Sequence, residues 1–153
     1  SEAPPARLVR KVHQTGRAQL EAITGAYRAA GRKAVVVPFI DNMSEAFANA
    51  DLVLCRAGAT TLAELTVAGK AAILVPLRSA ADDHQTWNAK ALVAEGAAVM
   101  LSEAELGTLG RTVADLVADP EKVRRIEDRS RSLGKPDAAA RVADLLSSLV
   151  AAA

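Results

Sequence analysis

Short apolar runs separated by longer polar or amphipathic stretches make up most of this chain. The runs are continuously apolar rather than alternating, which is typical of strands buried on both faces of a parallel sheet. Pro38 and Pro76 end two of them, and proline cannot donate to a strand ladder. The pattern predicts strands at residues 8–12, 34–37, 51–55, 71–75 and 97–101.

The stretches between these runs carry helix signals. Leu20, Ile23 and Tyr27 share one face of a helix expected over residues 18–30, and Gly31 is placed to end it. Further helices are expected at residues 43–50, 61–68, 83–95, 102–118, 119–133 and from 137 onward.

Local signals mark several helix ends in the second half of the chain. Ser102 and Glu105 have the spacing of a capping box, and Asp119 is an N-cap candidate followed by Pro120 at the first helical position. Gly96 is placed to end the helix before it. The last helix carries an apolar stripe formed by Ala140, Val142, Leu145, Leu146 and Leu149.

Strands alternating with helices predict a Rossmann-like, doubly wound α/β domain with a parallel sheet and right-handed crossovers. We interpret residues 1–153 as one such domain. Ligands in this architecture bind beyond the carboxyl ends of the strands. The loops expected there are residues 39–41, 56–61 and 77–85.

Composition narrows the class of protein. A length of 153 residues with 50% hydrophobic content suits one domain with a sizeable core, and a net charge of +1 argues against nucleic acid as a partner. No apolar run has the length of a membrane span, and the first residues lack the apolar stretch of a signal peptide. Cys55 is the single cysteine, in an apolar strand, which suits a core position in a reducing compartment. These features predict a cytoplasmic domain.

The segment at residues 51–69 is a strand, a tight turn and a helix, and the rest of the chain is organised around it. Small residues at 57–59 would let a ligand approach the free N–H groups of the helix, where the dipole favours a phosphate. Thr60 or Thr61 can cap this helix or donate a hydroxyl, and the position of Glu64 also fits a capping box. An ordinary capped helix without a ligand explains the same residues.

Other candidate residues lie on the remaining strand-exit loops. Phe39 and Ile40 offer an apolar surface for a base, or they cover the edge of the core. The Glu64 carboxylate could accept two ribose hydroxyls, or it is a favourable first-turn charge. Gln85 and Asn88 are three residues apart on one helix face, so both amides could reach sugar hydroxyls.

Three other kinds of site are not favoured. The Asp82-Asp83-His84 run invites a metal reading, but adjacent helical residues point in different directions and no second ligand cluster exists. His13 is as readily a structural strand-end residue as a ligand. No G-x-S-x-G elbow supports a hydrolase, and no G-x-G-x-x-G follows a strand to support dinucleotide binding.

Taken together, these segments resemble the carboxyl-terminal half of the MurG family. The segments are HQTG, then PFIDNMSEAFANADLVLCRAGATTLAELTVAGKAAILVPL, then DDHQTWNAKAL and GAA. The similarity is strong over residues 13–101 and looser in the tail KPDAAARVADLL. Members of this family are bacterial GT-B glycosyltransferases that move N-acetylglucosamine (GlcNAc) from UDP-GlcNAc to lipid I, giving lipid II with inversion. The resemblance implies that this half holds the UDP-GlcNAc donor.

The resemblance also implies roles for individual residues. Phe39 and Ile40 would contact uracil, Glu64 would hold the ribose hydroxyls, and Gln85 with Asn88 would bind the GlcNAc hydroxyls. The loop and helix start against the diphosphate and sugar would be Ala59, Thr60, Thr61, Leu62, Ala63 and Glu64, with Thr61 donating to a phosphate. The helix dipole and hydroxyl donors would stabilise the UDP leaving group, so no metal and no cofactor is expected.

The chain departs from the family in what it lacks. The family's amino-terminal domain is absent, with its base, its lipid I site and its surface for the cytoplasmic face of the inner membrane. The first strand of this half and its Gly-Gly-Ser phosphate loop are also absent, which would leave one sheet position unfilled and one strand edge exposed. No catalytic residue is therefore expected in this half, and we interpret the chain as a fragment that alone binds UDP-GlcNAc weakly or not at all.

Other interpretations of the chain stay open. It could be a stand-alone UDP-sugar-binding subunit that needs a separate acceptor-binding partner, or a non-catalytic nucleotide-binding α/β domain. A relative that uses another UDP-sugar with a lipid acceptor also fits, because the uridine contacts alone do not define the sugar.

Overall fold

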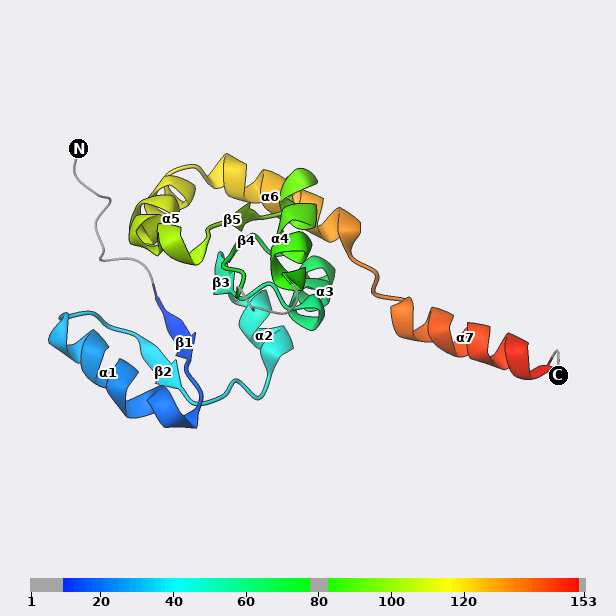
Figure 1. Cartoon of the computed structure of the whole chain (residues 1–153), viewed down its shortest axis with the longest axis horizontal. Helices are drawn as coiled ribbons and strands as arrows, with labels where there is room; N and C mark the ends of the chain where they lie inside the picture. The colour runs from blue at the N-terminus through cyan, green and yellow to red at the C-terminus, as the bar shows by residue number, and fades with distance from the viewer. Residues whose placement is uncertain (1–9, 78–82, 152–153) are drawn as a thin grey trace. The chain divides into compact units, whose positions relative to one another are not determined.

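The computed structural model describes residues 10–77 and 83–151, where strands and helices alternate along the chain (Figure 1). The chain divides into two compact units, Ser1–Asn49 and Ala50–Ala153. Each unit holds a sheet of its own, and every strand pairing in both sheets is parallel. The predicted α/β class with parallel strands is confirmed.

The first unit is a βαβ crossover followed by a short helix. Its elements are β1 (Val12–Gln14), the 3-10 turn η1 (Arg17–Gln19), α1 (Leu20–Ala29), β2 (Val35–Val37) and α2 (Met43–Ala48). Val12 lies opposite Val35 in the β1–β2 pair. Gly31 follows α1 in the left-handed conformation, with φ 62°, which explains why the helix ends where the sequence predicts.

The position of β1 is a correction. The apolar pattern predicts a strand at residues 8–12, of which 8 and 9 lie outside the described residues, but pairing runs from Val12 into the polar His13 and Gln14. Hydrogen bonding to β2 determines the position of this strand; for example, the Val35 N–H donates to the Lys11 carbonyl at 2.8 Å. Val12 and Val35 are 51% and 47% exposed, so the expected burial of these strands on both faces is also wrong.

The second unit has a three-stranded sheet in the order β3-β4-β5. Its strands are β3 (Val53–Cys55), β4 (Ala72–Leu74) and β5 (Val99–Met100). Its helical elements are α3 (Ala59–Ala68), α4 (His84–Ala94), η2 (Glu103–Thr108), α5 (Leu109–Val117), α6 (Pro120–Leu133) and α7 (Ala138–Ala151). All of β4 is buried, whereas Leu54 on the edge strand β3 is 52% exposed.

The core of the second unit lies between the sheet and two of its helices. Side chains from β4 and its flanks pack with Leu116 of α5 and Ile126 of α6. The capping box of Ser102 and Glu105 is present, although it opens the 3-10 segment η2 rather than an α-helix. The Asp119 carboxylate caps α6 by accepting from the Lys122 N–H at 2.9 Å, as the sequence predicts.

Helices α3 and α6 approach each other closely at their ends. The buried Ser130 hydroxyl of α6 lies 3.5 Å from the Leu65 carbonyl of α3. Gly134, which follows α6, is packed so tightly that a Cβ there would lie 2.7 Å from the Thr66 carbonyl oxygen. The two helices can meet at this point only because residue 134 has no side chain.

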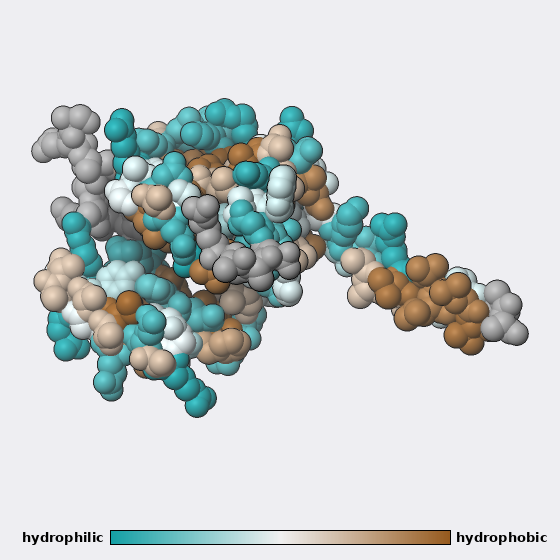
Figure 2. Space-filling model, in the orientation of Figure 1, coloured by the Kyte–Doolittle hydropathy of each residue, from teal (hydrophilic) through white to brown (hydrophobic). Residues whose placement is uncertain are grey.

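Helix α7 carries the predicted apolar stripe on exposed positions. Val142, Leu145, Leu146 and Leu149 are each more than half exposed, and Figure 2 shows apolar surface along this helix. Within residues 10–77 and 83–151, no helix is both long and apolar enough to cross a membrane.

Candidate functional site at the carboxyl ends of the strands

The turn after β3 is shorter than the sequence predicts. Helix α3 begins at Ala59 rather than at residue 61. Gly58 is its N-cap residue, with an extended backbone (φ −69°, ψ 140°), and its carbonyl accepts from the Leu62 N–H at 3.0 Å. No side chain caps this helix. The N–H groups of its first turn therefore lack a capping side chain beyond the carboxyl end of β3.

Thr60, Thr61 and Glu64 lie inside the helix rather than at its cap. The predictions that Thr60 or Thr61 caps α3, and that Glu64 completes a capping box, are wrong because the helix starts earlier. The Thr61 hydroxyl lies 3.9 Å from where a Cβ on Gly58 would stand, so it faces the turn. Glu64 is exposed in the second helical turn, which also removes its interpretation as a first-turn charge.

The remaining residues of this segment divide between surface and core. Ala59 and Ala63 are exposed, so a ligand could approach the backbone there. Leu62 is buried against the core, and its N–H already donates to the Gly58 carbonyl, so it offers a ligand no free donor.

Helix α4 brings the two candidate amides to the same edge of the sheet. The Gln85 Oε1 accepts from the Leu77 N–H at 3.0 Å, and the Asn88 Nδ2 donates to the Ala57 carbonyl at 3.2 Å. Asn88 thus joins α4 to the turn that precedes α3. Among the described residues, the Gln85 amide nitrogen and the Asn88 amide oxygen have no partner, so Gln85 can still donate and Asn88 can still accept.

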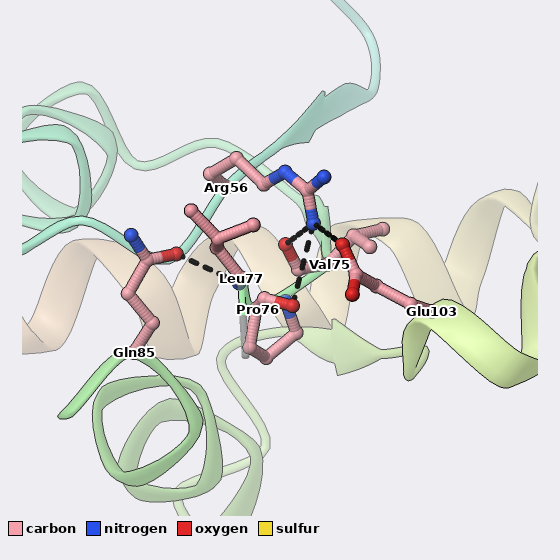
Figure 3. A network of polar contacts seen from close by, with 6 residues as sticks. All are labelled: Arg56, Val75, Pro76, Leu77, Gln85 and Glu103. Carbon is pink, nitrogen blue, oxygen red and sulfur yellow. Dashed lines mark hydrogen bonds and ion pairs between the residues drawn. The ribbon is translucent and has the colours of Figure 1, made fainter. Parts of the chain in front are cut away.

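Arg56, which the sequence analysis missed, makes several polar contacts at this edge (Figure 3). Its Nη1 lies 2.8 Å from a Glu103 carboxylate oxygen and donates to the carbonyls of Val75 at 3.2 Å and Pro76 at 3.3 Å. Arg56 and Glu103 are 47 residues apart, so no local pattern indicates the pair. The only available signal is an arginine placed directly after an apolar strand.

Phe39 and Ile40 lie in the first unit, at the exit of β2, while the other candidate residues lie in the second. The Phe39 side chain is 64% exposed, so it does not plug the core edge. The Ile40 N–H donates to the Gln14 Oε1 at 2.8 Å, which makes Gln14 a second residue that sequence reasoning missed. His13 contacts the Tyr27 hydroxyl through Nδ1 at 3.2 Å and meets its ring edge-on, a structural role.

Two other features bear on possible chemistry. Burial raises the pKa of the Cys55 thiol from 9.0 to about 11, so it is a neutral thiol at physiological pH and a poor nucleophile. Hydrogen bonds from the Ser102 side chain and backbone lower the pKa of Glu105. Within the described ranges no three His, Cys, Asp or Glu side chains gather as metal ligands; Asp82 of the Asp-Asp-His run lies outside those ranges.

A half-open cleft of about 220 Å³ lies beside α4 in the second unit. None of the residues that line it is a predicted substrate-binding residue, although Asp83 belongs to the Asp-Asp-His run; they are Pro76, Asp83, Thr86, Lys90, Met100 and Ser102. The candidate residues instead gather around the turn before α3 and the first turns of α4.

Comparison with known proteins places this arrangement in a family. The family model described as glycosyltransferase family 28 C-terminal domain matches residues 5–142. A Myxococcus xanthus (strain DK1622) protein is 53% identical over 136 residues, covering 88% of this chain and 36% of the relative. A Trichlorobacter lovleyi protein is 45% identical over 140 residues, covering 90% and 37%. Both are named UDP-N-acetylglucosamine--N-acetylmuramyl-(pentapeptide) pyrophosphoryl-undecaprenol N-acetylglucosamine transferase.

Solved structures agree with these matches. The crystal structure of Acinetobacter baumannii MurG superposes with a TM-score of 0.82 at 34% identity, covering 94% of this chain and 45% of that one. A Streptomyces sp. SF2575 glycosyltransferase, SsfS6, has a TM-score of 0.51 at 17% identity over 94% of this chain and 43% of its own, which supports the fold alone. The chain spans little more than a third of the length of the two curated relatives described above. The resemblance inferred from the motifs is confirmed, and the chain belongs to the glycosyltransferase family 28 C-terminal domain family.

Proposed function

We propose that this chain is the donor-binding half of a transferase that moves GlcNAc from UDP-GlcNAc to lipid I. The observation that carries the proposal is the hydrogen bond from Asn88 to the Ala57 carbonyl. This bond holds the first turns of α4, which carry Gln85 and Asn88, beside the start of α3. The two amides are suited to sugar hydroxyls, and the start of α3 is suited to a diphosphate. A site for a nucleotide sugar needs both in one place, and the two relatives described above are named as GlcNAc transferases.

The diphosphate would bind at the uncapped start of α3. Backbone N–H groups at Ala59, Thr60 and Thr61 have no capping side chain, and the positive end of the helix dipole favours an anion there. The Thr61 hydroxyl adds a donor on the side of the turn. Charge that develops on the leaving UDP during transfer would be stabilised by these fixed donors, which need no metal ion.

The two amides of α4 would read a sugar hydroxyl by complementary contacts. Gln85 retains a donor and Asn88 retains an acceptor after each has bonded to the backbone. A hydroxyl group can accept from the first and donate to the second. Because both amides are already fixed by backbone contacts, little side-chain entropy is lost when the sugar binds.

Each unit has exposed residues suited to one part of the nucleoside. Glu64 offers an unshielded carboxylate to the ribose diol, and the exposed Phe39 ring offers an apolar face to uracil. For the Ile40 N–H to read the edge of the base, the Gln14 side chain would release it. Gln14 then becomes free to contact the ligand itself.

The transfer step itself needs groups outside this chain. The acceptor hydroxyl of lipid I would attack the anomeric carbon as the bond from that carbon to UDP breaks, which inverts its configuration. A base must take the proton from the hydroxyl, and we assign no residue of this chain to that role. We further propose that residues 1–153 make up one UDP-sugar-binding domain and that the whole enzyme works at the cytoplasmic face of the inner membrane, with no nucleic-acid partner.

A chimera tests this proposal directly. The matching region of the Myxococcus xanthus transferase is replaced by this chain, and GlcNAc transfer from UDP-GlcNAc to lipid I is measured. We expect the chimera to transfer GlcNAc. Glu64→Ala and Gln85→Ala should each lower kcat/KM at least about tenfold, because each removes a hydrogen bond to the donor. Arg124→Gln, which breaks the exposed Arg124–Glu121 pair on α6, is the control and should leave transfer unchanged.

Two results would contradict the proposal. One is a folded chimera without transfer, and the other is transfer that is indifferent to Glu64→Ala and Gln85→Ala. Calorimetric titration of the 153-residue chain with UDP-GlcNAc, UDP and UDP-glucose separates the alternatives. Weak or absent binding by the isolated chain fits the proposed half-enzyme, whereas tight and selective binding would favour a stand-alone donor-binding subunit.

A further inference from the structure

The Arg56 guanidinium joins the exits of all the strands of the second unit. Arg56 itself follows β3, the carbonyls that it bonds belong to Val75 and Pro76 after β4, and Glu103 begins η2 after β5. All of these contacts are made by Nη1 (Figure 3). The side chains of Arg56 and Glu103 are 49% and 39% exposed, so the pair contributes little to stability as an ion pair.

The value of the contact lies in the two carbonyls. The β4 ladder ends at Val75, whose N–H donates to the Cys55 carbonyl at 2.9 Å. Beyond the ladder, the carbonyls of Val75 and Pro76 accept hydrogen bonds from Arg56, which is their partner among the described residues. A polar backbone group on this buried segment costs free energy when it is unpaired, so Arg56 restricts the conformations that the chain can adopt here.

The next residue connects this restraint to the candidate sugar site. The N–H of Leu77, directly after Pro76, donates to the Gln85 Oε1. The orientation of the Gln85 amide therefore depends on the position of the Leu77 N–H, which depends on how the Pro76 carbonyl is held. Glu103 directly follows Ser102, and the Ser102–Glu105 capping box holds the backbone at the start of η2 from which the Glu103 carboxylate reaches the guanidinium.

We propose that Arg56 is a positioning residue that holds the β4 exit in place and thereby orients the Gln85 amide toward the sugar. The consequence for donor selectivity rests on the proposed function, whereas the restraint on Leu77 does not. The two parts are tested separately: the restraint in the 153-residue chain, and donor selectivity in the chimera.

Hydrogen exchange of single amides tests the restraint. In Arg56→Gln, we expect the Leu77 amide to exchange at least about fivefold faster, because a hydrogen bond contributes about that factor. The Ile73 amide in the buried β4 should keep its rate. Gln85→Ala, which removes the acceptor for the Leu77 N–H, sets the upper limit of the effect, and Arg124→Gln is the control.

The conservative variant Glu103→Gln covers the case in which Arg56→Gln fails to fold. It keeps an acceptor for Arg56 but removes its charge, so a smaller acceleration at Leu77 is expected. An unchanged Leu77 rate in both folded variants would overturn the proposal. An equal acceleration at Leu77 and Ile73 would also overturn it, because it would mean general destabilisation rather than a local restraint.

Ligand titration tests the consequence in the chimera described above. Arg56→Gln should weaken the binding of UDP-GlcNAc more than the binding of UDP, because Gln85 is proposed to contact only the sugar. Equal weakening of both ligands would overturn the link to Gln85. If the unmodified chimera binds neither ligand, the proposed function fails, while the exchange rates at Leu77 still decide the restraint.

Discussion

Replacing Gly134 by alanine puts a methyl group where α6 ends against α3. The new Cβ would lie 2.7 Å from the Thr66 carbonyl oxygen, 3.0 Å from its carbonyl carbon and 3.1 Å from the Val67 Cα. These are backbone atoms of α3, so no side chain can rotate away. The backbone of Gly134, with φ −63° and ψ 143°, is acceptable for alanine, so the cost is steric and not conformational.

The magnitude follows from two opposing terms. Overpacking of this kind costs about 1–3 kcal/mol, and the reduced entropy of the unfolded chain returns about 0.4–1 kcal/mol. We therefore expect Gly134→Ala to lower the free energy of unfolding by about 1–2 kcal/mol. For a domain of this size, that corresponds to a fall in Tm of about 2–8 °C.

Urea unfolding followed by far-UV circular dichroism measures the effect. Gly110→Ala is the matched control, because Gly110 lies in α5 and nothing is within 4 Å of its added Cβ. That variant should be more stable than the parent chain by about 0.5–1 kcal/mol. If Gly134→Ala proved as stable as Gly110→Ala, the close approach of α3 and α6 would not hold the two helices as described.

Two further predictions concern the site edge. Between pH 9.0 and about 11 the unfolded chain loses the Cys55 proton while the folded chain keeps it. The free energy of unfolding should therefore fall as pH rises through this window. Cys55→Ala should remove that part of the pH dependence. Asn88→Asp cannot donate to the Ala57 carbonyl and should destabilise the chain by about 1–3 kcal/mol, measured by urea unfolding. Retention of full stability by Asn88→Asp would mean that this hydrogen bond does not join α4 to the turn.

Sequence reasoning succeeded where the controlling interactions are local. Asp119 and Pro120 start α6 at the predicted residue, because a cap and a restricted φ act within one turn of helix. Gly96 adopts the left-handed conformation, with φ 69°, two residues after the end of α4 for the same reason.

It failed where pairing or distant contacts decide the structure. The position of β1 depends on the partner strand, and polar residues such as His13 give no apolar signal for it. The start of α3 was misplaced because glycine and threonine have similar preference for the cap position, so residue type alone does not separate Gly58 from the threonines. The Arg56–Glu103 pair joins residues far apart in the chain and could be found only in the folded structure.

Glycine at position 58 has a consequence for the evolution of the chain. Its backbone is extended, and the nearest atom to an added Cβ, the Thr61 hydroxyl oxygen, is 3.9 Å away, so neither conformation nor crowding demands glycine. Serine or asparagine there would stabilise the helix by about a few tenths of a kcal/mol. That side chain would also occupy the donors proposed for the diphosphate. Stability therefore does not require glycine here, and a Gly58→Ser variant would exchange the proposed anion site for a slightly more stable helix.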